Sequence, residues 1–440
     1  MRDYKKALTN AFVKMAPGVI AATVVTGAAH GQEMPAPSEA STFVFNTSLF
    51  LISGMVVMFM AAGFCMLEVG LVRSKNAATI CVKNIALYSV AGIMVWLLGY
   101  NLIYGIEEGG FIGKFAVWGF DESEALENGY AASSDWYFQM VFVATAASIV
   151  SGTLAERIKL FPFLIFVAIL TGLIYPIQAS WKWGEGFLHT AFGFADFAGS
   201  TLVHSTGGWA ALAGALVLGA RKGRFEGGRV NAMPGSSLPL ATLGTFILWL
   251  GWFGFNGGSQ LALGTIDHAM SVARIFVNTN MAACAGVVTA LLLTQLRFGK
   301  VDLTIVLNGA IGGLVAITAE PLTPTLPAAV LIGAVGGVIV TFAIPLLDRF
   351  KIDDVVGAIP AHLFCGIWGT LVVPLTNSDA TLLGQLAGVV IIGVFVFAVS
   401  LAVWLALKFT LGLRASEEHE QLGLDKAELG LEAYPEFANG

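Results

Sequence analysis

Charged side chains are scarce in this chain. Asp, Glu, Lys and Arg make up 12% of its 440 residues, about half the share found in ordinary soluble domains. Hydrophobic residues make up 56%, and the mean hydropathy is +0.79. This composition excludes a soluble globular protein. The net charge of −6 lies largely in one loop and in the tail, and we expect no nucleic-acid partner.

Cysteine is also rare. The four cysteines, Cys65, Cys81, Cys284 and Cys365, lie in apolar stretches and lack the spacing of a metal site or a disulfide framework. We interpret them as small packing residues. We therefore expect neither a metal nor another cofactor.

Long apolar runs, by contrast, are abundant. Eleven runs are long enough to cross a hydrocarbon core of about 30 Å as helices. They lie at 46–70, 79–105, 133–154, 160–179, 198–220, 236–257, 270–296, 302–319, 325–348, 355–375 and 382–411. The sequence therefore predicts an all-α polytopic membrane protein with eleven transmembrane helices in a lipid bilayer.

Basic residues gather in every second loop between these runs. They include Arg73, Lys75, Arg157, Lys159, Arg221, Lys222, Arg224, Arg229, Arg297, Lys300, Arg349, Lys351 and, in the tail, Arg414. Because Lys and Arg are retained on the cytoplasmic side, we predict the N-terminus outside and the C-terminus in the cytoplasm.

The N-terminal leader begins with basic residues, among them Arg2 and Lys14, and continues into a short apolar run that ends in small residues. This order is typical of a cleaved secretory signal, which we predict at 1–31. An amphipathic or disordered leader is the alternative. The eleven-helix domain is predicted at 41–412 and a cytoplasmic tail at 413–440.

Two predicted helices each carry an aspartate and a histidine. Asp196 precedes His204 by eight residues, and Asp354 precedes His362 by eight. An ionisable group within a membrane is a functional-site candidate, and an aspartate at a helix start can accept free backbone N–H groups. At 1.5 Å per residue each histidine lies about 12 Å beyond its aspartate. The two imidazoles are therefore expected to meet near mid-membrane.

The matching offsets also indicate an internal repeat. Helices one to five and six to ten are predicted to be inverted copies, with the eleventh helix extra. Inverted repeats place the substrate site near the midplane, where the histidines are expected.

Two facing histidines in an apolar pore are expected to stay neutral, because burial disfavours the imidazolium form. Such a pair suits a small polar solute or a proton relay, whereas a bare metal cation would need a ring of oxygens. Two buried histidines could also hold one haem in an electron carrier, and this alternative stays open.

Aromatic residues gather where a cation would first be met. Phe138 and Phe142 open the third run, Trp183 precedes Asp196, and GWFGFNGGS supplies Trp252, Phe255 and Ser259. A desolvated cation gains about 1 to 2 kcal/mol over an aromatic face. An interfacial aromatic belt explains any one of these residues, but their convergence favours a binding site.

Five motifs carry a resemblance to the Amt/Mep/Rh ammonium transporter family, of the bacterial Amt type. They are DFAGSTLVH, GWFGFNGGS, FVNTN, TLAERIK and HLFCGIWG, and the resemblance extends from the first helix to the tail. It implies a homotrimer in the plasma (inner) membrane, with one pore through each subunit. It also implies an ammonium transporter and not an enzyme.

The resemblance implies roles for individual residues. Phe142, Trp183 and Ser259 resemble the outer site that recruits ammonium, and Phe142 and Phe255 the stacked gate. His204 and His362 resemble the twin pore histidines, Trp252 a pore-lining tryptophan, and Asp196 the structural aspartate needed for transport. We include Phe138 with the pore.

Charge itself suggests how such a pore selects its cargo. Ammonium buried whole would pay an ionic desolvation penalty, whereas ammonia would pay only a few kcal/mol. The ion is therefore expected to be split into ammonia and a proton, which potassium cannot be. We favour net charge movement. The alternative function is an ammonium sensor that signals through its tail.

Glu68 lies near the end of the first run, with Lys83 and Asn84 opening the second. We interpret it as a buried structural carboxylate held by one of them, although a role in transport stays open.

The tail keeps the family's Gly-Leu-Asp and Glu-Ala-Tyr segments, which in relatives contact a trimeric PII-type signal protein. Leu429 and Leu431 stand where relatives have histidine and glutamate, which weakens the expectation of a PII partner. A solvated acidic tail is the alternative.

Overall fold

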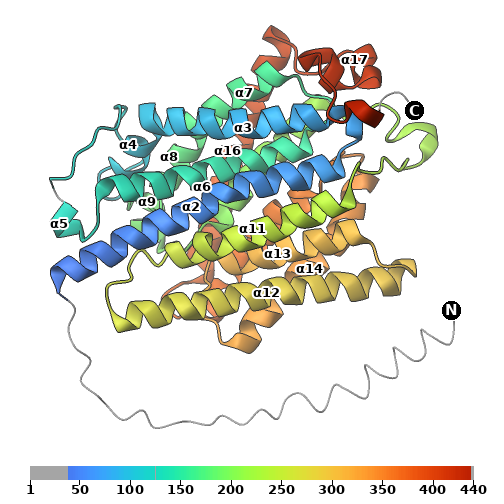
Figure 1. Cartoon of the computed structure of the whole chain (residues 1–440). Coiled ribbons are helices and arrows are strands. Elements are labelled where there is room, and N and C mark those ends of the chain that lie inside the picture. The colour runs from blue at the N-terminus through green and yellow to red at the C-terminus, as the bar shows by residue number, and fades with distance from the viewer. Residues whose placement is uncertain (1–37, 124, 438–440) are drawn as a thin grey trace, which may run out of the picture.

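The computed structural model describes residues 38–123 and 125–437. Within these ranges the chain is all-helical, without a β-strand beyond one isolated bridge between Ile158 and Arg414. The long helices lie side by side in one bundle (Figure 1). The all-α prediction is confirmed, and the predicted signal segment at 1–31 lies outside the described residues.

Eight helices in the described part are long and apolar enough to cross a membrane. Five are uninterrupted: α2 (Glu39–Leu71), α11 (Leu238–Gly258), α12 (Ile266–Phe298), α14 (Leu326–Arg349) and α16 (Leu382–Thr410). Three contain a π-helical turn: α3 (Ala77–Met94) with η2 (Val95–Gly99) and α4 (Tyr100–Tyr104), α7 (Leu160–Ile169) with η3 (Leu170–Ile174) and α8 (Tyr175–Ser180), and η4 (Ser200–Ser205) with α10 (Thr206–Leu218).

Three further helical segments occupy the remaining predicted runs: α6 (Ala132–Thr153), α13 (Leu303–Thr318), and η6 (Ile359–Phe364) with α15 (Cys365–Leu371) and η7 (Val373–Leu375). They are shorter or less apolar because they lie inside the bundle, where polar side chains find partners. The structure is thus compatible with eleven spans.

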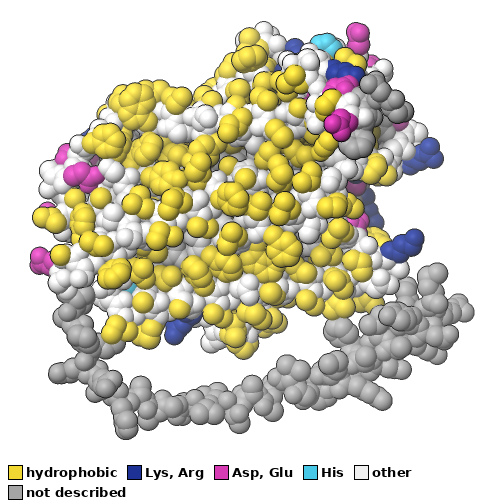
Figure 2. Space-filling model, viewed as in Figure 1, with side chains coloured by type: hydrophobic (Ala, Val, Ile, Leu, Met, Phe, Trp, Pro, Cys, Tyr) yellow, Lys and Arg dark blue, Asp and Glu magenta, His cyan; other side chains and the backbone are white. Residues whose placement is uncertain are grey.

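The surface shows where the bundle contacts lipid. Apolar side chains cover the middle of the visible face, and charged side chains lie toward its two ends (Figure 2). Ile52, Phe59 and Ile85, on α2 and α3, are among the exposed large apolar side chains. Such a large apolar surface is stable in a bilayer and not in water. We call the end that carries Arg73, Arg157 and Arg221 the basic end, and the opposite one the vestibule end.

Short helices and turns connect the spans. These are η1 (Ser74–Asn76) and η5 (Glu226–Gly228) at the basic end, α5 (Ala125–Asn128) and α9 (Phe187–Phe192) at the vestibule end, and α17 (Glu417–Leu422), η8 (Asp425–Leu429) and η9 (Pro435–Phe437) in the tail.

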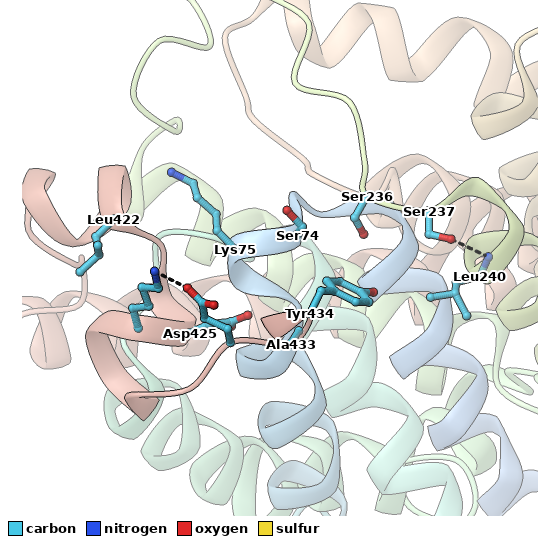
Figure 3. Close-up of a pocket in the computed structure, with 11 residues that line it drawn as sticks. Ser74, Lys75, Ser236, Ser237, Leu240, Leu422, Asp425, Ala433 and Tyr434 are labelled. Atoms are coloured by element: carbon cyan, nitrogen blue, oxygen red, sulfur yellow. Dashed lines mark hydrogen bonds and ion pairs between the residues drawn. The ribbon is translucent and has the colours of Figure 1, made fainter. Parts of the chain in front are cut away.

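The tail folds back on the basic end of the same chain. The Asp425 carboxylate accepts the backbone N–H groups of Ala78 (2.9 Å) and Thr79 (2.7 Å) at the start of α3. A groove of about 510 Å³ separates the tail from the loops beneath it. Tyr434 and Asp425 lie on the tail side of this groove, opposite Ser74 and Ser236 (Figure 3).

Candidate functional site

Asp196 anchors the start of η4. One carboxylate oxygen accepts the N–H groups of Gly199 (3.0 Å) and Ser200 (2.9 Å), and the other those of Thr201 and Leu202 (2.9 Å each). Asp196 is buried, so these four bonds replace its hydration. The predicted contact between this aspartate and a helix start is present.

Asp354 anchors η6 in the same way. Its carboxylate accepts N–H groups from Gly357 (3.2 Å) and Ile359 (2.7 Å), and the hydroxyl of Thr153 at 3.0 Å. Both aspartates therefore precede a π-helical turn that carries a histidine. This likeness favours the predicted inverted repeat.

The two histidines meet in the middle of the bundle, as their spacing predicts. His204 Nδ1 and His362 Nδ1 are 3.2 Å apart, and the ring centroids are 5.2 Å apart. At this distance one ring must donate its Nδ1 proton and the other must accept it. Two ligands of one metal atom on opposite sides would lie about 4 Å apart. The contact thus favours a hydrogen-bonded pair over haem ligands.

Close packing fixes this pair. A Cβ on Gly366, just after η6, would lie 2.3 Å from the carbonyl oxygen of Ser200 and 2.5 Å from Ser205 Oγ. Only glycine allows η4 and α15 to cross this closely. The histidines are therefore positioned by a close approach between η4 and the start of α15, which directly follows η6.

Trp252 holds the His204 ring from one side. The two rings stack with centroids 4.9 Å apart and an interplanar angle of 20°. The indole N–H donates to Thr318 Oγ1 at 2.8 Å, which fixes its orientation. His204 Nε2 has no hydrogen-bond partner among the described residues. This nitrogen is therefore free to form a hydrogen bond with a small ligand.

A phenylalanine pair lies on the vestibule side of the histidines. Phe142 and Phe255 stack with centroids 4.0 Å apart and an interplanar angle of 24°. Phe255 also lies 5.3 Å from the His204 ring, and Phe138 packs edge-on against Phe142 at 4.8 Å. Each of these three phenylalanines is at most 1% exposed. The stacked pair separates the histidines from the vestibule end.

A cavity of about 480 Å³ opens at the vestibule end of this stack. Its lining includes the predicted Phe138, Phe142, Trp183 and Ser259. The Trp183 indole donates to the Asp196 carbonyl oxygen at 3.0 Å, and the Ser259 hydroxyl donates to the Phe255 carbonyl at 2.8 Å. The structure therefore brings the predicted outer residues together around one cavity.

Asp135 in the same cavity was missed by the sequence reasoning. It accepts a hydrogen bond from Tyr100 Oη at 2.6 Å and one from Gln139 Nε2 at 3.0 Å. The described residues that line the cavity include no Lys or Arg, so this carboxylate faces only neutral donors. An acid at the start of a helix is usual in any protein, so the sequence alone did not indicate that Asp135 lines this cavity.

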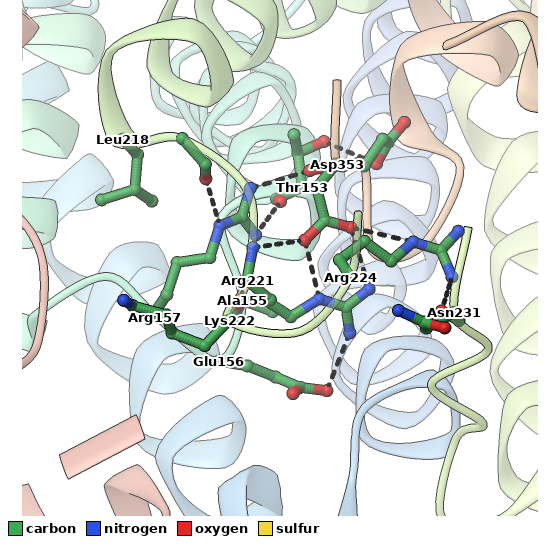
Figure 4. Close-up of polar contacts among 12 residues, drawn as sticks. Thr153, Ala155, Glu156, Arg157, Leu218, Arg221, Lys222, Arg224, Asn231 and Asp353 are labelled. Atoms are coloured by element: carbon green, nitrogen blue, oxygen red, sulfur yellow. Dashed lines mark hydrogen bonds and ion pairs between the residues drawn. The ribbon is translucent and has the colours of Figure 1, made fainter. Parts of the chain in front are cut away.

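The basic end is held by a buried charge cluster (Figure 4). Arg221 donates to Asp353 through its backbone N–H and Nε, both at 2.8 Å, and to Glu156 at 3.1 Å. Arg157 donates to the backbone carbonyl of Asp353 at 2.7 Å. Burial opposes ionisation of Asp353, but the hydrogen bonds from Arg221 and the charges of Arg157 and Arg221 outweigh it and hold the pKa of that carboxyl well below its usual range. The cluster fixes the loop that carries Asp354.

Comparison with known proteins agrees with this architecture. The Ammonium Transporter Family model matches residues 48–434. The putative ammonium transporter sll1017 of Synechocystis is 40% identical, with 94% of each chain covered. Ammonium transporter Amt2 of Archaeoglobus fulgidus is also 40% identical, covering 91% of this chain and 92% of that one.

Solved structures show the same fold. A structure titled Sensor Amt Protein has a TM-score of 0.83 at 33% identity and covers 89% of this chain and all of that one. Candida albicans Mep2 has a TM-score of 0.80 at 28% identity and covers 91% and 92%. This protein belongs to the ammonium transporter family.

Proposed function

We propose that the chain takes up ammonium at the vestibule end, separates it into ammonia and a proton, and conducts ammonia past the histidine pair with net movement of charge. The observation that carries this proposal is the buried contact between His204 and His362 behind the Phe142–Phe255 stack. Both contacts are made by residues of a single chain.

The outer cavity supports recruitment of a cation. Phe142 and Trp183 offer aromatic faces, and their rings meet edge-on with centroids 6.1 Å apart. A desolvated cation gains about 2 kcal/mol over such a face. Ser259 offers hydroxyl lone pairs, and Asp135 adds a negative charge to the same cavity. We therefore add Asp135 to the three residues that the family resemblance implies.

The stacked phenylalanines favour removal of the proton. Passing an intact ion between two apolar rings would cost far more than passing neutral ammonia. Potassium cannot lose its charge in this way, so the same barrier rejects it. Selectivity thus follows from acid–base chemistry rather than pore diameter.

The histidine pair can interact with ammonia and can also carry the proton. His204 Nε2 is free to accept from, or donate to, ammonia in the pore. The Nδ1–Nδ1 hydrogen bond connects His204 with His362, so a proton can move from ring to ring by exchange of tautomers. This connection supports charge movement alongside ammonia.

Electrical recording tests the proposal. The full chain in proteoliposomes is expected to give an inward positive current on addition of ammonium chloride and none with potassium chloride. His204→Ala and Asp196→Ala are expected to reduce the current at least tenfold. The first removes a proton-transfer group, and the second leaves four buried backbone N–H groups without their acceptor. Ammonia flux without any current would contradict charge movement. The absence of both flux and current would contradict transport itself.

A sensor is the second candidate, favoured by the likeness to the structure titled Sensor Amt Protein. Here ammonium would alter the docking of the tail without net flux.

Native mass spectrometry with and without a PII-type protein tests both the homotrimer and the partner that the resemblance implies. Labelling of introduced surface cysteines from either side tests the predicted orientation.

A further inference from the structure

A small cavity lies between the histidine pair and the basic end. Its polar lining consists of His362, Glu68, Ser148 and Asn308, and the rest is apolar. The room for the centre of a water-sized sphere is about 10 Å³, which corresponds to about one water molecule. A molecule with a single heavy atom, such as ammonia or ammonium, fits this space.

Glu68 presents one unused oxygen in this lining. Its Oε2 accepts hydrogen bonds from Ser151 Oγ (2.8 Å) and Asn84 Nδ2 (3.2 Å). Its Oε1 has no partner among the described residues, although Glu68 is only 1% exposed. A buried oxygen without a partner is costly and calls for an explanation.

Among residues 38–123 and 125–437, no basic side chain supplies the missing contact. Lys83, one of the two partners expected from the sequence, donates instead to the backbone carbonyl of Ser151 at 2.9 Å. Asn84, the other, binds Oε2, as predicted for a structural carboxylate. Within the described part of the chain, the cavity lining contains no Lys or Arg. Oε1 therefore remains free for a ligand that can share or accept a proton.

The cavity chemistry favours a nitrogen ligand over a metal ion. Ser148 donates its proton to the Ala144 carbonyl at 3.1 Å, so its lone pairs can accept an N–H group. Asn308 already uses its amide protons on Thr304 and Val356. A metal ion would require a full ring of oxygens, whereas ammonium needs a few separate acceptors.

We propose that Glu68 is an inner ammonium site, where ammonia that has passed His362 regains its proton. The inference rests on the proposed transport function. Ammonia takes the proton of the Glu68 carboxylic acid: the O–H bond breaks, an N–H bond forms with the nitrogen lone pair, and ammonium leaves toward the basic end. The resulting carboxylate is reprotonated by the proton released in the vestibule and carried through His204 and His362.

Infrared difference spectroscopy tests this on the full chain in lipid, with ammonium chloride as the probe. Ammonium is expected to decrease the carbonyl band of a protonated carboxylic acid. The change should be absent in Glu68→Gln, shifted in Glu68→Asp, and retained in Asp302→Asn. Asp302 is the matched control because it caps α13 at the surface of the basic end, outside the cavity.

Ammonium currents provide the second readout. Glu68→Gln is expected to lower the current by about 100-fold, the usual scale for loss of a proton-transfer group, with partial recovery in Glu68→Asp. An unchanged band in the wild type, or a Glu68→Gln current within about twofold of wild type, would overturn the inference. If Glu68→Gln does not fold, the wild type and Glu68→Asp still decide it. Absence of any wild-type current would instead reject the proposed transport. The infrared band tests Glu68 separately, because it reports protonation and not transport.

Discussion

At the residue scale, the proposed pore contains carboxylates whose surroundings differ. Asp196 accepts four backbone N–H groups and is fully used in structure. Asp135 accepts two neutral side-chain donors and lies beside an open cavity, so its charge can act on a ligand. Glu68 keeps one oxygen free. The number of hydrogen bonds that each acid already accepts is therefore our reason for proposing ligand contacts at Asp135 and Glu68 and not at Asp196.

Asp135→Asn removes the charge of the outer cavity and nearly keeps its shape. The ammonium concentration for half-maximal current is expected to rise about tenfold, which corresponds to about 1.4 kcal/mol. A carboxylate and a cation at 4 Å gain about 1 to 4 kcal/mol between bulk water and a protein surface. Currents measured over a range of ammonium concentrations check this. Glu127→Gln, an exposed acid near the same end but outside the cavity lining, should change nothing; equal curves for both variants would rule out Asp135 in recruitment.

At the element scale, the site depends on how η4 crosses the segment that carries His362. Both elements are π-helical turns anchored by an aspartate. Such turns are frequent at functional sites. Hydrophobic periodicity does not distinguish a π-helical turn from an ordinary helix, so the sequence predicted the helices and the meeting of the histidines but not this local geometry.

Gly366→Ala tests the crossing. The added Cβ would meet the Ser200 carbonyl at 2.3 Å, so the two elements must move apart. We expect a destabilisation of about 1 to 3 kcal/mol and a reduced ammonium current, measured by thermal unfolding and by electrical recording. Gly119→Ala is the control, because nothing lies within 4 Å of a Cβ at that position. Equal unfolding temperatures for both variants would show that the crossing tolerates a side chain.

Asp425→Ala tests the docking of the tail. The change removes two backbone hydrogen bonds at the start of α3 and the bond from Thr79 Oγ1 at 2.8 Å. Loss of such a cap costs about 0.5 to 2 kcal/mol, so we expect faster trypsin cleavage after Lys426. Glu417→Gln should leave the rate unchanged, because its ion pair with Lys222 is exposed. Cleavage at the wild-type rate in Asp425→Ala would mean that other contacts hold the tail.

At the scale of the whole molecule, the two ends are built differently. The vestibule end is open around an aromatic cavity, whereas the basic end is tied together by Arg221, Asp353 and Glu156 and covered by the tail. Glu156 adopts a left-handed backbone conformation with φ of 70°, which is unusual for a residue other than glycine. The charge cluster holds it there. The basic end thus provides the rigid support for the loop that carries Asp354.

Asp353→Asn should destabilise the protein by about 3 to 5 kcal/mol, because Arg221 keeps its buried charge and loses its main partner. The pKa of Asp353 is lowered in the folded chain, so its contribution is present above the unfolded carboxyl pKa and lost only as the pH falls through the lower folded value. The difference in unfolding temperature from wild type should therefore be constant from about pH 7 to pH 5 and narrow below about pH 4. The unfolding temperature of Asp302→Asn should stay close to that of wild type at every pH. If the unfolding temperatures of Asp353→Asn and wild type already converge at pH 6, the lowered pKa of Asp353 is not the cause.

The sequence by itself determined the membrane class, the positions of the helical runs and the two Asp–His pairs. These follow from properties read along the chain: apolar length, and a rise of 1.5 Å per residue that places each histidine at a fixed depth. The aromatic residues were identified from their clustering near the outer helix ends, and the family resemblance assigned their roles. Their convergence around one cavity was an expectation that the structure places in space.

Only the tertiary structure decided which polar groups are satisfied and which are free. In the sequence Asp135 reads as an ordinary acid near a helix start and Glu68 as a buried structural carboxylate, and what distinguishes them in the fold comes from helices far apart in the chain. Ser151 and Asn84 take one oxygen of Glu68, while the cavity beside His362 leaves the other without a partner. Hydrogen bonding depends on distances of a few ångströms between separate elements, which the order of residues alone does not contain.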